Sequence, residues 1–88
     1  MVYKILLHPK ANAFLETVGN DLRTRIREGL LTLGADPKKG TRLKHSEFWR
    51  LRIGDYRAIY EIDHEARTVI ILFLGHRKTV YDDFSRLI

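Results

Sequence analysis

The amino-acid sequence predicts an α+β fold in a single domain of residues 1–88. Three observations support this prediction: a short apolar run opens the chain, two stretches with apolar residues at helical spacing follow it, and strand-like runs then flank the turn pair Gly54-Asp55. A chain of 88 residues can bury one modest hydrophobic core. We therefore expect an N-terminal strand, a helical hairpin, an antiparallel β-meander and a short C-terminal tail.

The N-terminal segment predicts a strand followed by a helix. Residues 3–7 are mostly apolar, and the run stops at His8-Pro9, where proline suits the first turn of a helix. In residues 9–18 the apolar side chains recur at positions i, i+3, i+4 and i+7, which places them on one stripe of a short amphipathic helix. These side chains are Ala11, Phe14, Leu15 and Val18.

A second helix is predicted directly after the first. Gly19 ends the first helix, Asn20 is a good N-cap, and helical spacing of apolar residues continues as far as Gly34. The spaced residues are Leu22, Ile26, Leu30 and Leu33. We expect the two helices to form a hairpin.

The second half of the chain is predicted to be β-structure. Residues 35–42 contain Pro37 and Gly40 and are expected to form a loop, and residues 48–62 read as a hairpin with a two-residue turn. Residues 68–74 are nearly all apolar or β-branched, as in a strand that is buried on both faces. The C-terminal tail is expected to be a short helix or irregular, because its apolar residues recur every three positions, at Tyr81, Phe84 and Leu87.

The chain is basic, with 16 Lys and Arg against 11 Asp and Glu, a net charge of +5 and a pI near 9.8. This balance is typical of proteins that meet polyanions. Some of the charge lies on the outward side of the second helix, where a solvated face is expected more than phosphate contacts, at Arg23, Arg25 and Arg27. The chain has no cysteine, and its first apolar run is too short for a signal peptide or a membrane span, so we expect a cytoplasmic protein.

Pairing around the turn predicts two different faces on the hairpin. Direct partners in an antiparallel pair share a face, so one face collects Trp49, Leu51, Ile53, Tyr56, Ala58 and Tyr60. The other face collects Arg50, Arg52, Arg57 and Glu61. Arg52 opposite Arg57 is a like-charge pair, which is destabilising unless an anion lies between the guanidiniums. The alternative is a solvent-exposed face on which Glu61 forms a salt bridge with Arg50.

The hairpin and its flanks resemble one known family. The run FWRLRIGDYRAIYEI of residues 48–62, with Leu43-Lys44 before it and GHRKTVY of residues 75–81 after it, is similar to the RelE/ParE toxin superfamily. The resemblance implies the fold predicted above and a type II toxin that enters the ribosomal A site and cuts messenger RNA without metal. It also implies no cofactor, and neutralisation by a cognate antitoxin.

The resemblance also implies the site. The catalytic positions fall on Arg50, Arg52, Arg57, Arg77 and Tyr81, and further RNA contacts fall on Lys44, His76 and Lys78. For His76, packing or hydrogen bonding at a strand end is the favoured alternative. Well-known members carry lysines at the positions of Arg50 and Arg52, and arginine is a poor base, so Tyr81 becomes the candidate base by default.

Two other functions stay open at this point. One is a ParE-like toxin that acts on DNA gyrase, and the other is a basic nucleic-acid-binding domain without chemistry. A metal site is not expected, because no i, i+4 pairing links the histidines His8, His45, His64 and His76. The expected partners are messenger RNA, the ribosome and an acidic, RelB-like antitoxin that is partly disordered when free. The antitoxin is expected across the helical hairpin or in place of the segment around Tyr81.

Overall fold

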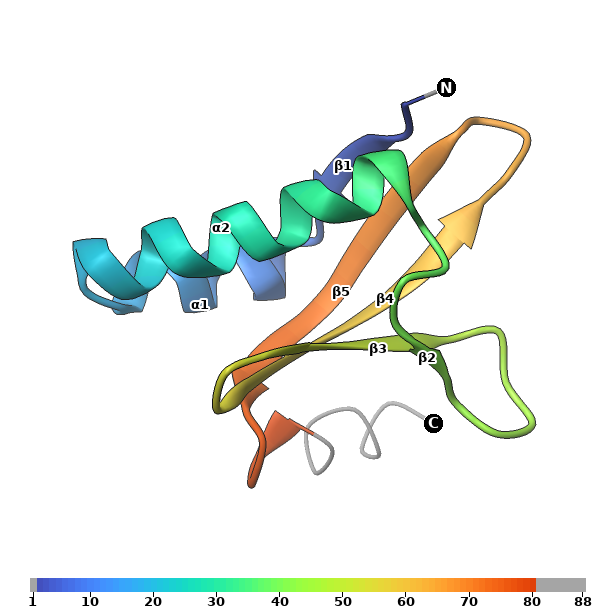
Figure 1. The fold of residues 1–88 in the computed structure, drawn as a ribbon. Helices are drawn as coiled ribbons and strands as arrows, with labels where there is room; N and C mark the ends of the chain where they lie inside the picture. The colour runs from blue at the N-terminus through green and yellow to red at the C-terminus, as the bar shows by residue number, and fades with distance from the viewer. Residues whose placement is uncertain (1, 81–88) are drawn as a thin grey trace.

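The computed structural model describes residues 2–80, and within them it confirms the α+β fold (Figure 1). The elements are β1 Lys4–Leu7, α1 Pro9–Thr17, α2 Asn20–Ala35, β2 Thr41–Arg42, β3 Trp49–Ile53, β4 Tyr56–Asp63 and β5 Thr68–His76. Within this described part, no helix combines the length and the apolar character that a membrane crossing requires. The apolar tail positions Tyr81, Phe84 and Leu87 lie outside the described residues.

The strands form one five-stranded sheet in the order β1-β5-β4-β3-β2. The meander predicted for β3, β4 and β5 is present, with antiparallel pairing throughout. Two features extend it. The N-terminal strand β1 pairs in parallel with β5, from Lys4 opposite Thr68 to Leu7 opposite Ile71, and the predicted loop contains the two-residue strand β2, which pairs with β3.

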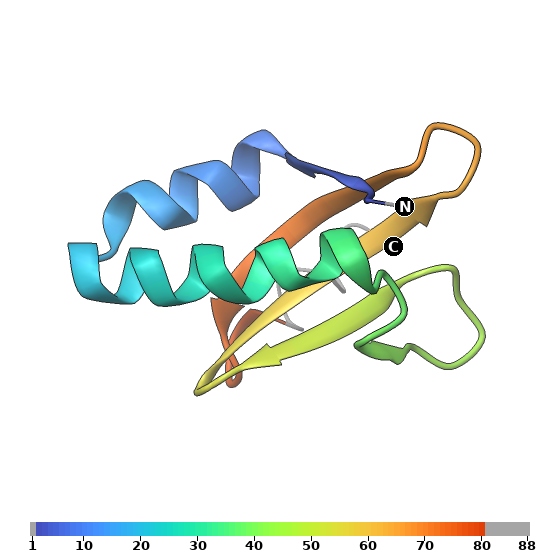
Figure 2. The same ribbon diagram turned by 45° about the horizontal axis from the view of Figure 1, so that its top comes forward.

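Both helices lie side by side on one face of the sheet (Figures 1 and 2). Helix α1 begins as predicted, with Pro9 in its first turn and the His8 ring accepting a hydrogen bond from the Lys10 N–H at 3.2 Å. The main core fills the space between helices and sheet, and its buried members are Ala11, Leu15, Ile26, Leu30, Leu33, Leu51, Ile53, Ala58, Tyr60, Val69, Ile71 and Leu74.

A second, smaller core lies apart from the main one. Its buried residues are Ile59 of β4, Phe73 of β5 and Val80, with Leu43, Phe48 and Leu72 packed against them. Ile59 is paired with Phe73, so both lie on one face of the sheet, and Ile59 is also paired with Arg50. The face that carries the arginines is therefore partly apolar, and the chain after β5 packs onto it.

The start of α2 differs from the prediction. Gly19 is the N-cap and Asn20 is the first helical residue, so the asparagine side chain does not cap the helix. Arg23 is half-buried rather than solvated, because its guanidinium donates to the carbonyl oxygens of Leu15 at 2.9 Å, Glu16 at 3.3 Å and Val18 at 3.0 Å. A cation at a helix C-terminus stabilises carbonyls that lack a helical partner. Arg23 thus joins the end of α1 to α2.

Replacing Arg23 with alanine is expected to lower the free energy of unfolding by about 1–2 kcal/mol, because the carbonyls at the end of α1 lose a charged donor. Urea unfolding checks this. Arg25→Ala is the matched control, since Arg25 lies on the same helix, is exposed and carries the same charge. Equal losses in the two variants would contradict the role assigned to Arg23.

Candidate functional site

The β3–β4 hairpin places the predicted arginines as the sequence indicated. Arg52 lies directly opposite Arg57, and Arg50 lies opposite Ile59. The turn between the strands contains Gly54, whose φ of +59° is readily adopted by glycine. The predicted register is therefore confirmed, and with it the like-charge pair.

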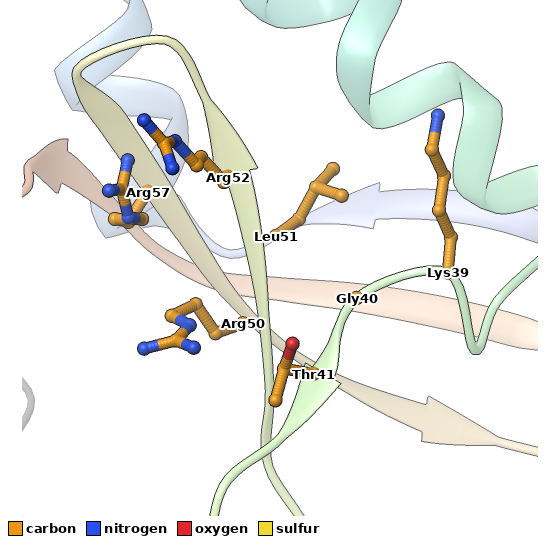
Figure 3. Close-up of a pocket in the computed structure, with 7 residues that line it drawn as sticks. All are labelled: Lys39, Gly40, Thr41, Arg50, Leu51, Arg52 and Arg57. Atoms are coloured by element: carbon orange, nitrogen blue, oxygen red, sulfur yellow. The ribbon is translucent and has the colours of Figure 1, made fainter.

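These arginines line an open hollow of about 390 Å³ beside the outer strand β2 (Figure 3). Its lining residues are Lys39, Gly40, Thr41, Arg50, Leu51, Arg52 and Arg57, so no acidic side chain of the described residues contributes to it. Figure 3 shows the three arginine side chains leaving the hairpin toward one side, while Leu51 and Lys39 point elsewhere. Three guanidiniums gathered on one side of a hairpin form a surface suited to a polyanion.

Arg57 is held in place by the turn that precedes it. Its Nη1 donates to the carbonyl oxygens of Gly54 and Tyr56, both at 2.9 Å. The same turn also anchors the end of β5, because the backbone N–H of Arg77 donates to the Asp55 carbonyl at 2.8 Å. The structure therefore brings Arg77 beside the hairpin turn that orients Arg57.

Arg52 is exposed and, within the part of the chain described here, makes no hydrogen bond or ion pair. Glu61 also forms no ion pair within 4.0 Å with any residue between positions 2 and 80. The salt bridge between Glu61 and Arg50 that the sequence left as an alternative is thus not formed. The charge of Arg52 is not compensated by a neighbouring carboxylate, and the hollow keeps its positive character.

The remaining predicted site residues lie elsewhere. His76 is paired with Tyr56, on the helix-covered face, and its ring makes an edge contact with the Tyr56 ring at 5.6 Å between centroids. Its Nδ1 accepts a hydrogen bond from the Lys78 N–H at 3.2 Å, so His76 packs as the alternative predicted, away from the arginines. Lys44 is exposed in the loop between β2 and β3, and Lys78 follows β5, neither of them lining the hollow. Tyr81 lies outside the described residues.

Gly40 and Thr41 join the site without having been predicted. The two-residue strand β2 places Thr41 directly opposite Arg50, so both side chains share a face. Gly40 lies against β3, because a Cβ atom there would collide with the Arg50 carbonyl oxygen. Gly40 lies in the connection from α2 to the β3–β4 hairpin. It is the one sequence signal for this close approach, because a residue without a side chain lets two backbone segments come near each other.

Tyr60 fixes the loop that carries Gly40. Its hydroxyl donates to the Pro37 carbonyl oxygen at 2.8 Å and accepts from the Gly40 N–H at 3.2 Å. Burial raises the pKa of the Tyr60 phenol above its ordinary value, an effect that the Gly40 hydrogen bond opposes and the charge of Asp36 increases. The folded protein therefore favours the protonated phenol.

Tyr60→Phe is expected to cost about 1–2 kcal/mol of unfolding free energy at neutral pH, since the Pro37 and Gly40 backbone groups lose their partner. The stability that the raised Tyr60 pKa supplies is complete below about pH 10, the ordinary tyrosine pKa, and is lost as the pH rises through the folded value. The difference in stability between the wild type and Tyr60→Phe should therefore shrink above pH 10 in urea unfolding. A difference that grows at high pH would contradict this assignment.

Residues 2–80 contain no group of three or more His, Asp or Glu side chains placed to hold a metal ion. The charged side chains that line the arginine hollow are cations. Arginine keeps its proton at neutral pH and grips phosphate through two parallel hydrogen bonds. The arrangement is thus suited to binding a phosphate group and to stabilising negative charge that develops on it.

Solved structures with the same fold are toxins and toxin–antitoxin complexes. A chain of the RelBE2 complex from Mycobacterium tuberculosis is 27% identical with a TM-score of 0.78, over 88% of this chain and 93% of that chain. A chain of the RelE–RelB complex from the archaeon Pyrococcus horikoshii is 26% identical with a TM-score of 0.74, over 88% of this chain and 97% of that chain. A free mutant of Escherichia coli RelE is 19% identical with a TM-score of 0.79, over 100% of this chain and 99% of that chain.

The sequence itself matches a family model. No curated protein sequence matches the chain. The family described as the ParE toxin of the type II toxin–antitoxin system parDE matches residues 5–81, which include both described helices and every described strand except the first residue of β1, Lys4. The match agrees with the solved structures on the fold and with the hairpin motif on the superfamily. The chain therefore belongs to the ParE toxin family, within the RelE/ParE superfamily of type II toxins.

Proposed function

We propose that this toxin is a metal-independent endoribonuclease that cuts messenger RNA, most effectively in the ribosomal A site. The observation that carries the proposal is the positive hollow on the hairpin, where Arg50, Arg52 and Arg57 gather and the exposed Arg52 makes no ion pair among residues 2–80. The like charges of Arg52 and Arg57 repel each other in the absence of a ligand. A phosphate between them removes that penalty.

In the proposed reaction the ribose 2′-oxygen attacks the adjacent phosphorus and passes its proton to a base. The bond from phosphorus to the 5′-oxygen breaks, the 5′-oxygen takes up a proton, and a 2′,3′-cyclic phosphate remains. Arg50, Arg52, Arg57 and Arg77 stabilise the extra negative charge of the phosphorane, for which fixed cations are effective. Tyr81 is proposed as the base, because an arginine does not give up its proton at neutral pH.

Messenger RNA on the ribosome is the proposed substrate, with Lys44 and Lys78 as outlying phosphate contacts. A site with few acid or base groups gains most in rate when another macromolecule aligns the reacting atoms of the substrate, and the ribosome holds messenger RNA in a fixed path. The exposed positions of Lys44 and Lys78 suit contacts to a backbone that continues beyond the hollow.

We further propose that an acidic, RelB-like antitoxin neutralises the toxin. RelE chains of M. tuberculosis, P. horikoshii and E. coli are found in complexes with RelB-type antitoxins, which supports such a partner. An apolar groove between β1 and α2, lined by Ile5, Leu7, Arg27, Leu30 and Leu31, fits an amphipathic segment laid across the helical hairpin. Leu31 is 66% exposed there. Large apolar side chains left open in this way are typical of interaction sites.

Inhibition of DNA gyrase is the second candidate, because the matching family model is named for ParE. The cluster of arginines on the hairpin favours RNA cleavage. Two assays on the purified toxin separate the candidates: primer extension on messenger RNA in a programmed ribosome complex, and supercoiling by gyrase. We expect new RNA ends and unchanged supercoiling. Inhibited supercoiling with intact RNA would overturn the proposal, and intact RNA with unchanged supercoiling would leave only a binding role.

A further inference from the structure

A second hollow of about 360 Å³ lies next to the arginine site, on the other side of β2. Neighbouring residues of that strand line the two hollows, Thr41 the first and Arg42 the second. Their partners on β3 are Arg50 and Trp49, and successive residues of a strand point to opposite faces. The two hollows therefore lie next to each other at the outer edge of the sheet, separated by β2.

The second hollow has an aromatic wall. Trp49, the only tryptophan of the chain, is half-buried and lines the cavity. Its ring stacks on Tyr60, with 6.3 Å between centroids and 22° between planes, and Tyr60 is fully buried and fixed by its own hydrogen bonds. One side of the indole thus packs against a buried ring that is fixed by its own hydrogen bonds. A rigid aromatic surface is the usual support for an unstacked base of single-stranded RNA.

The polar groups of this hollow are mixed in charge. Two carboxylates, Glu47 and Glu61, line it together with Lys38, Arg42 and His64. Neither carboxylate makes a hydrogen bond or ion pair with any residue in positions 2–80, so their oxygens are available as acceptors. His64 uses Nδ1 in its 3.0 Å contact with the Tyr3 hydroxyl, and Arg42 uses Nε to donate to the Ser46 carbonyl oxygen at 3.0 Å. Their outer nitrogens remain available to a ligand.

Among the four RNA bases, guanine matches this set of groups. Its Watson–Crick edge presents two adjacent donors, N1–H and the N2 amino group, which one carboxylate accepts together. Adenine, cytosine and uracil each present a ring acceptor or carbonyl where a carboxylate would be repelled. The O6 and N7 acceptors of guanine suit a basic side chain such as Arg42 or Lys38.

We propose that the hollow beside Trp49 is a guanine-binding subsite, in which the base stacks on the indole and is read by Glu47 or Glu61. The proposal rests on the RNA substrate proposed above, and it adds base recognition to a site whose arginines read only phosphate. It predicts that the toxin selects a guanine next to the nucleotide held by the arginines.

Trp49 makes the test direct, because the intrinsic tryptophan fluorescence of this chain comes from the proposed subsite alone. Guanosine monophosphate is titrated into the purified full-length toxin, in parallel with adenosine, cytidine and uridine monophosphates and with inorganic phosphate. We expect saturable quenching by guanosine monophosphate at concentrations roughly tenfold lower than for the other nucleotides, as lost base-edge hydrogen bonds imply. Inorganic phosphate should leave the fluorescence unchanged. Equal quenching by all four nucleotides, or none, would overturn the proposal.

Isosteric variants identify the reading group. Glu47→Gln and Glu61→Gln are compared with Glu65→Gln, a control that removes an exposed carboxylate outside the hollow. We expect at least one of the first two to reduce the guanine preference about tenfold and the control to leave it unchanged. Preference retained in the double variant Glu47→Gln/Glu61→Gln would refute carboxylate reading. Guanine binding without RNA cleavage would support the subsite and contradict the proposed ribonuclease activity. RNA cleavage without a base preference would support the ribonuclease activity and contradict the subsite.

Discussion

Arg52→Ala is expected to lower the rate of messenger RNA cleavage in a ribosome complex by about 10²–10³-fold, the usual effect of removing one fixed group that stabilises developing charge. Arg52 is the cleanest probe of the site. Its side chain is exposed and makes no hydrogen bond or ion pair among residues 2–80, so its removal disturbs no described contact. Arg57→Ala should slow cleavage to a similar extent, but it also removes the two hydrogen bonds to the turn.

Arg52→Ala should also raise the free energy of unfolding. Arg52 and Arg57 face each other across the hairpin, and relief of a like-charge pair of this kind stabilises a sheet by roughly 0.2–1 kcal/mol. A variant that is slower and more stable indicates a residue selected for function at a cost to the fold. Arg25→Ala, on the exposed side of α2, is the control for the loss of one positive charge. It should change neither the cleavage rate nor the free energy of unfolding much.

Primer extension measures the cleavage rate, and urea unfolding measures the stability. Cleavage by Arg52→Ala within a few-fold of the wild-type rate would show that the arginine face is only a charged surface. Arg52→Lys gives a further distinction, because lysine keeps the charge but lacks the planar fork. We expect the lysine variant to recover only part of the cleavage rate that alanine loses. Its point charge still attracts the phosphate, but it cannot donate the two parallel hydrogen bonds that an arginine offers to the phosphorane.

The sequence predicted the part of the site that depends on local rules. A two-residue turn with glycine in its first position fixes the hairpin register, and the register alone places Arg52 opposite Arg57. The apolar face of the same hairpin followed from alternation, and the helices followed from the spacing of their apolar residues. Each of these features is decided within about 15 residues of chain, where period and turn chemistry are informative.

Other features depend on contacts between distant segments and left no local signal. Strand β2 has two residues and exists because it pairs with β3, so the sequence did not show that Gly40 and Thr41 line the hollow. Arg23 was expected on a solvated face because the end of α1 was not known to approach it. His76 was grouped with the arginines by its place in the motif, although strand pairing puts it on the opposite face, against Tyr56.

Gly40→Ala is expected to lower the free energy of unfolding by about 3 kcal/mol, near the upper end of the usual cost of overpacking. The added Cβ would collide with the Arg50 carbonyl oxygen and lie 2.7 Å from the Tyr60 hydroxyl oxygen. Neither atom is free to move, since the first is strand backbone and the second is held by Pro37. The collision is therefore relieved only by displacing β2 from β3.

This displacement should also slow cleavage, although every arginine is still present, because β2 forms one wall of the hollow and Thr41 is paired with Arg50. Gly29→Ala is the matched control. The atoms nearest to a Cβ at Gly29 are side-chain atoms of Ile53, at 3.0 and 3.5 Å, and alanine is a better helix former than glycine, so a much smaller change is expected. Urea unfolding and primer extension check both variants. Unchanged stability in Gly40→Ala would mean that β2 is held loosely, and the arginine hollow would then lack the fixed wall that positions a phosphate for in-line attack.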